Sequence, residues 1–321
     1  MIVLSKLDFV KGEENLESVA VMDCYHNFID DKRTYCSQKT VAYYQDNLTR
    51  LFNCLREYYA VELEKITADM ITMDFLQNYI MYLRSCDISN VSVKTYYRAV
   101  KVFSTWLYRR KIIEGDVAMD VKTPKAYPEE KIPLTVQEVE FIDSYFDINT
   151  EKGIRNYLIF HLMLDCGLRR GEVVALTKQD IDFENHIISV IGKGSKNRFV
   201  PVPDALLSLF TTYHSLYDLD PEAAFVTLRD NQPISENTVK LMFRDLKAEC
   251  GLERLHPHLL RHTFATSYIL GGGNVEFLRI LLGHADIQTT QMYMHISSNC
   301  RLLNMDVYRL DEIFFKIFRY Y

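Results

Sequence analysis

Four short stretches of the 321-residue sequence contain side chains that could carry out chemistry on a charged group. They read "CGLRRGE", "GKGSKNR", "HPHLLRHTFAT" and "LLGHADIQTTQMYMH". In the third stretch a histidine and an arginine stand three residues apart, which places both on one turn of a helix. In the fourth a tyrosine follows a histidine by nine residues. The candidate residues are Arg169, Lys193, His258, Arg261, His284 and Tyr293.

Each of these residues has an ordinary explanation when it is considered alone. Arg169 could form a surface ion pair, Lys193 could lie in a solvated turn, and His258 could cap the helix that it precedes. Tyr293 could be a half-buried packing residue, as tyrosines in helices usually are. A scattered motif therefore needs one task that explains all of its members.

Displacement at a phosphodiester is such a task. Arg169 and Arg261 could hold the phosphate, because a guanidinium donates in a bidentate fork and stays charged. Preorganised donors of this kind usually supply the largest electrostatic stabilisation. Tyr293 could be the nucleophile once its phenol, with an ordinary pKa of about 10, loses its proton. Lys193 on a hairpin could protonate the leaving alkoxide.

The composition is that of a globular chain with two domains. The net charge of −6 argues mildly against a nucleic-acid partner, but the clustering of basic residues is a better guide. Seven cysteines without a CxxC pair indicate a reduced chain with no disulfide framework and no structural zinc. No apolar run reaches the roughly 18 residues of a membrane span, and the N-terminus does not resemble a signal peptide, so we expect a cytoplasmic protein with no membrane partner.

The elements that must position these residues differ between the two halves of the chain. Residues 1–120 predict a helical domain, in which Ser37 and Thr72 begin two helices and a third, basic helix runs from Ser92 to Lys111. Residues 121–133 predict a linker that contains prolines. The expected fold is mainly α with a small β-hairpin, an α+β protein.

The second half predicts helices around one β-hairpin. Thr135 and Glu138 form a capping-box pattern, and the next helix breaks at Gly167 and resumes before "RRGE". The stretch "HIISVIGKGSKNRFVPVP" predicts two strands around a turn, and most of the chain after Asp204 is again helical.

The four stretches, in this order and at these gaps, resemble the catalytic domain of the tyrosine recombinases, the phage-integrase family. The resemblance covers residues 134–296, and it extends more weakly to residues 15–125, which are similar to the family's helical core-binding domain. It implies a two-domain clamp, with a core-binding (SAM-like) DNA-binding domain at 1–120 and a catalytic domain at 134–299.

The resemblance also assigns roles residue by residue. Tyr293 matches the nucleophile, and Lys193 matches the general acid on the departing 5′-oxygen. Glu172 matches a position that braces Arg169 from behind. The implied reaction forms a 3′-phosphotyrosyl link and keeps the bond energy in that ester, so no ATP, metal or other cofactor is expected. The remaining matches are the two catalytic arginines and the two histidines, Arg169, Arg261, His258 and His284.

The partner implied is a double-stranded DNA recombination site, bound by a dimer on one site and by a tetramer in synapsis. Accessory DNA-bending proteins are left open, as is the choice among integration, excision and resolution, and the gene would be bacterial or carried by a mobile element. The expected DNA contacts come from the basic helix and the hairpin: Lys94, Arg98, Lys101, Lys196 and Arg198.

The last segment, residues 300–321, carries an apolar stripe at helical spacing that includes Leu303, Val307, Leu310 and Phe314. Such a face needs a surface to cover it. The family resemblance favours a C-terminal helix that docks on a neighbouring protomer over one that packs in cis.

Three other functions compete with this interpretation. A zinc hydrolase could use His258 and His262 at i,i+4 spacing, although Arg261 between them would lie beside the metal. A type IB-like relative could relax DNA by the same tyrosine chemistry without pairing two duplexes. A DNA-binding relative could have lost the ability to cut, but all six catalytic positions are filled here.

Overall fold

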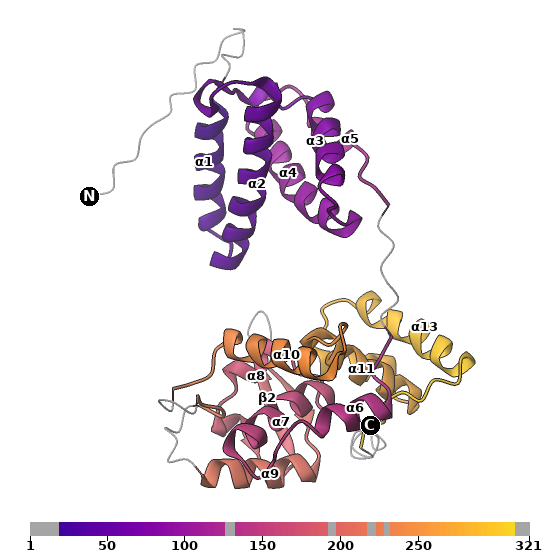
Figure 1. Ribbon diagram of the computed structural model, residues 1–321. Helices are drawn as coiled ribbons and strands as arrows, with labels where there is room; N and C mark the ends of the chain where they lie inside the picture. The colour runs from indigo at the N-terminus through magenta and orange to yellow at the C-terminus, as the bar shows by residue number, and fades with distance from the viewer. Residues whose placement is uncertain (1–18, 126–131, 192–196, 217–222, 228–231, 312–321) are drawn as a thin grey trace. The chain divides into compact units, whose positions relative to one another are not determined.

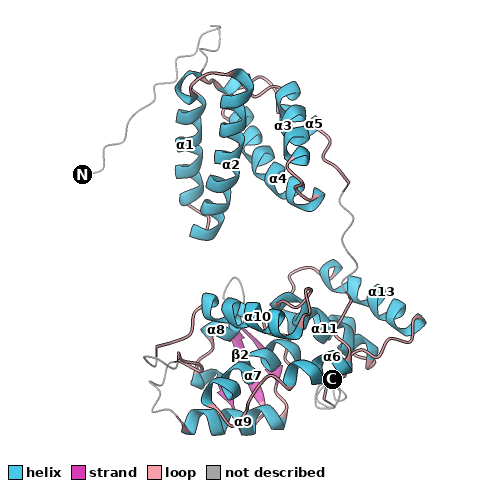
Figure 2. Cartoon of the chain, viewed as in Figure 1, coloured by secondary structure: helices cyan, strands magenta, loops and turns pink. Residues whose placement is uncertain are grey.

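The computed structural model describes residues 19–125, 132–191, 197–216, 223–227 and 232–311. The chain forms two compact units that divide between Glu129 and Glu130, inside the segment predicted to be a linker. Each unit has its own hydrophobic core. Figures 1 and 2 show an all-helical N-terminal unit and a C-terminal unit in which helices surround a small sheet.

The N-terminal unit is a helical bundle in which the caps predicted at Ser37 and Thr72 are present, whereas the basic helix begins at Asn90 after the cap Ser89 and not at Ser92. Ser37 accepts a hydrogen bond from the Thr40 amide at the start of α2, and Thr72 does the same for Phe75 at the start of α3. Its helices are α1 (Val21–Arg33), α2 (Gln38–Tyr59), α3 (Met73–Ser85), α4 (Asn90–Arg109) and α5 (Val117–Asp120), with 3-10 turns at Leu63–Lys65 and Ala68–Met70.

The basic helix α4 exposes two of the three basic residues predicted to contact DNA. Lys94 and Arg98 are exposed. Lys101 is half-buried, because its Nζ donates to the Met119 carbonyl at 3.4 Å and lies 5.8 Å from the centre of the Tyr97 ring. Lys101 therefore also joins α4 to the segment that carries α5.

In the C-terminal unit the chain winds helices around a three-stranded antiparallel sheet of order β1-β2-β3. Thr135 and Glu138 form the predicted capping box at the start of α6. The two predicted strands are present, with Val190 opposite Arg198 and Ile191 opposite Asn197, whereas the turn between them lies outside the described residues. The elements up to the hairpin are α6 (Val136–Asp143), α7 (Glu151–Leu164), α8 (Arg170–Ala175), the 3-10 turn Lys178–Asp180, β1 (Ile181–Asp182), β2 (Ile187–Ile191) and β3 (Asn197–Pro201).

One helix is central to this unit. Every residue of α11 from Leu259 to Tyr268 is buried, and the helix packs against α7 and α13. Its polar residues Thr263 and Thr266 hydrogen-bond to carbonyls one turn earlier, which allows them to lie in the core. The helices after the hairpin are α9 (Asp204–Ser215), α10 (Glu236–Cys250), α11 (Pro257–Leu270), α12 (Val275–Leu282) and α13 (Gln288–Leu302). None of the helices in the described part of the chain is both long and apolar enough to cross a membrane.

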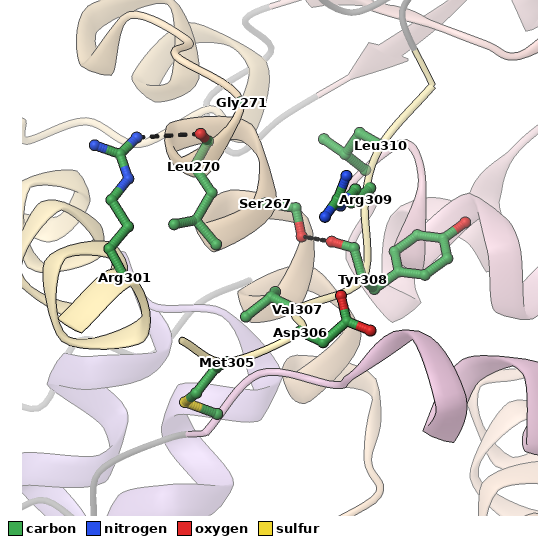
Figure 3. A pocket seen from close by; sticks show the side chains of 10 residues that line it. All are labelled: Ser267, Leu270, Gly271, Arg301, Met305, Asp306, Val307, Tyr308, Arg309 and Leu310. Atoms are coloured by element: carbon green, nitrogen blue, oxygen red, sulfur yellow. Dashed lines mark hydrogen bonds between the residues drawn. The ribbon is translucent and has the colours of Figure 1, made fainter. Parts of the chain in front are cut away.

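The predicted C-terminal helix is wrong over residues 303–311. α13 ends at Leu302, and the chain then pairs Val307 with Thr135 in a β-bridge. The Tyr308 amide donates to the Leu134 carbonyl at 2.9 Å, while Val307 and Leu310 are buried in their own unit. Figure 3 shows this segment beside α11, with Ser267 donating to the Tyr308 carbonyl. Residues 312–321, including Phe314, lie outside the described residues.

A buried ion network anchors the same segment. His161 of α7 contacts Asp165 at 2.7 Å and Asp143 at 2.9 Å through its two ring nitrogens. The Tyr308 hydroxyl donates to the other oxygen of Asp165 at 2.8 Å. Burial lowers the pKa of His161, but the two carboxylates outweigh it and raise that pKa to about 9. The imidazolium therefore holds α6, α7 and the C-terminal segment together.

Candidate active site

A glycine break places Arg169 at the head of a short helix. α7 ends at Leu164, and Gly167 then adopts a left-handed conformation with φ of 65°. A Cβ atom at this position would lie 2.6 Å from Cδ1 of Phe264, so the turn requires glycine for space as well as for backbone geometry. The predicted break is confirmed, and Arg169 becomes the N-cap residue of α8.

Glu172 is in direct contact with Arg169. Its carboxylate accepts from the Arg169 amide at 2.7 Å and from Arg169 Nη1 at 2.9 Å. Burial raises the pKa of Glu172, but the hydrogen bonds and charge of Arg198, with those of Arg169, lower it to about 2. Glu172 is therefore ionised throughout the physiological pH range.

Arg198 does not occupy the position expected of a DNA contact. Its side chain is only 5% exposed, and its two Nη atoms donate to the two Glu172 oxygens at 2.8 and 2.7 Å. Its Nε donates to the Leu281 carbonyl at 2.7 Å. The prediction expects an exposed side chain, whereas the Arg198 guanidinium faces inward and is bonded to Glu172 and Leu281.

Arg261 is buried at the centre of the site. Its Nη1 donates to the Gly167 carbonyl at 2.6 Å, and its Nη2 donates to the Leu282 carbonyl. Burial and the charge of Arg169 lower its pKa to about 9, still above neutral pH. The guanidinium therefore remains charged while its hydrogen bonds run to neutral carbonyls, which leaves its charge available to an anion.

Tyr293 of α13 lies within electrostatic range of Arg261 and Arg169. It is 8% exposed, and its ring centre is 5.2 Å from that of His262 on α11. Burial raises the pKa of the Tyr293 phenol, and the positive charges of Arg261 and Arg169 act in the opposite direction. The phenol therefore lies where the two arginines would stabilise its anion.

His284 follows α12 and points to α13. Its Nδ1 lies 2.9 Å from the Thr290 hydroxyl, and Thr290 is fully buried one turn before Tyr293. Burial, together with the charges of Arg261 and Arg169, lowers the pKa of His284 to about 4. His284 is therefore neutral at pH 7 and can offer one N–H to a ligand.

The other predicted residues divide into three groups. His258 is exposed on the first turn of α11, with its ring centre 6.4 Å from that of His256. Lys193 and Lys196 lie outside the described residues. Lys94 and Arg98 belong to the other unit.

A cavity of about 740 Å³ lies beside Arg169 and His284. Glu172, Gly283 and Ile191, the last residue of β2, also line it, whereas Arg261 and Tyr293 do not. Among the described residues no group of three or more His, Cys, Asp and Glu side chains is arranged to hold a metal ion. What this cluster offers is positive charge beside a phenol and a neutral imidazole, which suits a phosphate group.

The sequence did not predict that Arg198, Thr290 and His262 contact the candidate catalytic residues or their neighbours from inside the fold. For Arg198 a signal was available, since strand alternation puts it on the same face as Val200, which is fully buried. Thr290 and His262 carry no comparable signal, because their contacts with His284 and Tyr293 join different helices.

A helical unit followed by a unit in which buried arginines and a buried tyrosine share one site is the arrangement of the tyrosine recombinases. Residues 133–299 match the model of the phage integrase family, and residues 20–121 match the phage integrase SAM-like domain. The chain belongs to the phage integrase family, and it is a site-specific DNA recombinase that acts through a tyrosine.

Curated relatives and solved structures agree with this assignment. The chain is 30% identical to tyrosine recombinase XerC of Chlamydia caviae over 234 residues, 71% of this chain and 75% of that protein. It is 29% identical to XerC of Staphylococcus aureus over 287 residues, 87% of this chain and 92% of that protein. The Tn1549 transposon integrase, solved in complex with a circular intermediate DNA, shares the fold with a TM-score of 0.70 at 20% identity, over 90% of this chain and 100% of that one. A lambda integrase dimer bound to a core site has a TM-score of 0.69 at 16% identity, over 85% of this chain and 94% of that one.

Proposed function

We propose that Tyr293 is the nucleophile and that Arg169 and Arg261 bind the scissile phosphate of a double-stranded DNA recombination site. The observation that carries this proposal is that Arg261 and Arg169 bind the neighbouring carbonyls of Leu282 and Gly283, with the buried Tyr293 phenol within electrostatic range of both. A phosphate held by those guanidinium groups would lie next to the phenol oxygen, and its transition-state charge would meet donors that are already in place.

Two histidines complete the proton transfers on the tyrosine side. His258, exposed at the start of the same helix as Arg261, takes the phenol proton. His284 is neutral, and in the tautomer in which the Thr290 hydroxyl donates to its Nδ1, Nε2 carries the hydrogen and can donate to a phosphate oxygen.

The covalent step is balanced without a cofactor. The Tyr293 oxygen forms a bond to phosphorus while the bond from phosphorus to the 5′-oxygen breaks, and Lys193 gives that oxygen a proton. A 5′-hydroxyl from the partner duplex then attacks the phosphotyrosyl ester, which releases Tyr293 and reseals the strand. The ester energy is conserved, so ATP and metal ions are not required. Integration, excision and resolution all use these steps.

The N-terminal unit supplies further DNA contacts in this proposal. Lys94 and Arg98 are exposed on α4, four residues apart and so on one face of the helix. Positive side chains in such a row contact phosphates and fix the register of a protein on DNA without reading its sequence. Lys196 on the hairpin turn belongs to the same proposed group.

A duplex with a nick just beyond the cleavage point tests this function. Cleavage releases a short strand that diffuses away, so the covalent intermediate accumulates. We expect a protein–DNA adduct that resists denaturation and forms equally well in EDTA. Loss of the adduct in EDTA would indicate the metal-hydrolase alternative, and relaxation of supercoiled plasmids that lack a recombination site would favour the strand-relaxing alternative.

Assembly on DNA is the second part of the proposal. Val307 and Leu310 are buried in their own unit, so we place the docking on a neighbouring protomer in residues 312–321. We expect that removal of residues 312–321 preserves binding to a half-site but abolishes cooperative binding to a full site. Gel-shift titrations on the two sites measure this directly, with the full-length chain as control. Unchanged cooperativity in the truncated protein would contradict docking in trans.

A further inference from the structure

We propose that Arg198 is a positioning residue that sets the geometry of the phosphate-binding arginines and does not itself contact DNA. This inference rests on the roles proposed above for Arg169 and Arg261. Arg198 would act through Glu172 and through the end of α12, and it would join the hairpin that carries Lys193 to the rest of the site.

The strand geometry turns Arg198 inward. Along β3 the side chains alternate, so that Phe199 is 64% exposed while Arg198 and Val200 are buried. An exposed phenylalanine beside a buried arginine reverses the usual preference of these residue types. A buried charge in that position requires partners that hold it.

Those partners occupy every nitrogen of the guanidinium group. Nη1 and Nη2 form a two-pronged contact with the carboxylate of Glu172, and Nε donates to the carbonyl of Leu281. Arg261 is equally buried but donates to the backbone carbonyls of Gly167 and Leu282. The charge of Arg198 is therefore neutralised by a carboxylate, whereas that of Arg261 is held by neutral acceptors and stays available to an anion.

Three consecutive carbonyls at the end of α12 receive the three arginines. Arg198 binds the carbonyl of Leu281, Arg261 that of Leu282, and Arg169 that of Gly283 at 3.4 Å. The C-terminus of a helix carries partial negative charge and orphan carbonyls, so it attracts and orients cations. The end of α12 thus acts as a common support for all three side chains.

Close packing makes this support sensitive to the shape of the Arg198 side chain. A Cβ atom at Gly283 would lie in van der Waals contact with Arg198, 3.4 Å from both Cδ and Nη1, so the Arg198 side chain lies directly beside the turn after α12. Lysine carries the same charge but offers one compact ammonium in place of a planar fork. It could not bind both Glu172 oxygens and the Leu281 carbonyl at once, and Arg169 and the hairpin would shift.

The test compares cleavage with DNA binding in the variant Arg198→Lys. Single-turnover cleavage of the nicked duplex should fall by about 100-fold, as expected for a small misplacement of reacting groups. DNA affinity should change by less than about threefold, and its dependence on salt concentration should stay the same. If Arg198 instead contacted a phosphate, Arg198→Lys would keep its activity, and Arg198→Met would reduce the slope of log affinity against log salt by about 0.9. Near-normal cleavage in Arg198→Lys together with that reduced slope in Arg198→Met would overturn the proposal.

A second buried arginine supplies a matched control. Arg155 on α7 is 7% exposed and donates to the Val226 carbonyl and to Asn156. We expect Arg155→Lys to cleave within about twofold of the wild-type rate, because no element of the proposed site contains it. A similar loss of cleavage in both variants would indicate general damage to the fold and would contradict a positioning role.

Glu172→Gln gives an independent reading if Arg198→Lys folds poorly. Because Arg198 is inferred to act through Glu172, the double variant should be little worse than either single variant, whereas multiplied losses would contradict the inference. The outcome is separable from the proposed function. If Tyr293→Phe eliminates the adduct while Arg198→Lys cleaves normally, only the positioning role of Arg198 fails. If the adduct persists in Tyr293→Phe, the proposed function itself fails.

Discussion

Replacement of Tyr293 by phenylalanine is expected to eliminate the covalent protein–DNA adduct, a loss of roughly 10⁴-fold or more in single-turnover cleavage, which is the scale seen when a catalytic nucleophile is removed. The substitution takes away one oxygen and keeps the ring that packs beside His262. The fold and the arginine cluster should therefore persist, and DNA affinity should stay within about threefold of wild type, since phosphate contacts supply most of that affinity.

The measurement is adduct formation on the nicked duplex, read on a denaturing gel, together with affinity from a gel shift. Tyr268→Phe is a suitable control, because Tyr268 is a buried tyrosine in the same unit that has no proposed part in the chemistry. It should form the adduct at close to the wild-type rate. An adduct that persists in Tyr293→Phe would refute Tyr293 as the nucleophile, and a loss in both variants would point to a packing defect.

Replacement of Arg261 by lysine is expected to have the second-largest effect, a loss of about 10³-fold in cleavage at saturating DNA. The loss of one preorganised donor commonly costs 10²- to 10³-fold, and Arg261 presents a fork in place of a single donor. A lysine ammonium could replace the contact to Gly167 or to Leu282, but it could not keep both and still bind a phosphate. The expected defect is therefore in the rate of the covalent step more than in binding.

Stability must be measured beside activity for this variant. Arg261 is 5% exposed, and an acceptor that loses its buried donor costs about 1–3 kcal/mol. We expect a lower unfolding temperature in Arg261→Lys, but a protein that is folded at 25 °C. If the folded variant cleaved at more than a tenth of the wild-type rate, Arg261 would not be a principal phosphate ligand. Arg155→Lys again controls for the loss of a buried guanidinium.

Several features of this protein followed from local physics and were therefore accessible from the sequence. The caps at Ser37, Thr72 and Thr135 depend on a side chain and an amide three residues apart. The break at Gly167 depends on one residue that can adopt positive φ. The two hairpin strands follow from β-branched runs. The types and spacing of the candidate catalytic residues were likewise enough to indicate chemistry at a phosphodiester.

The C-terminal segment shows where periodicity alone misleads. Leu303, Val307 and Leu310 recur at helical spacing, yet residues 303–311 are not helical. A backbone hydrogen-bonding partner beside Leu134 and Thr135, some 170 residues earlier in the chain, outweighs the local helical preference. An apolar stripe predicts that a segment will be buried against some surface. The surface that buries it also determines whether the segment is helical or extended.

The side-chain direction of Arg198, inside the site, was likewise decided by the tertiary structure. From the sequence, Lys193, Lys196 and Arg198 form one basic hairpin, and the one local sign that separates a side chain facing the core from those expected to meet DNA is strand alternation, which puts Arg198 on the face of Val200. The structure makes that separation, because Glu172 on α8 and the carbonyls at the end of α12 converge on one face of β3. The sequence by itself determined which chemical groups this protein has and where its helix caps and turns lie, because side-chain types are fixed covalently and caps and turns depend on neighbouring residues. Only the tertiary structure decided which charges face a substrate and which hold the others in place, because that depends on partners brought together from distant segments by packing.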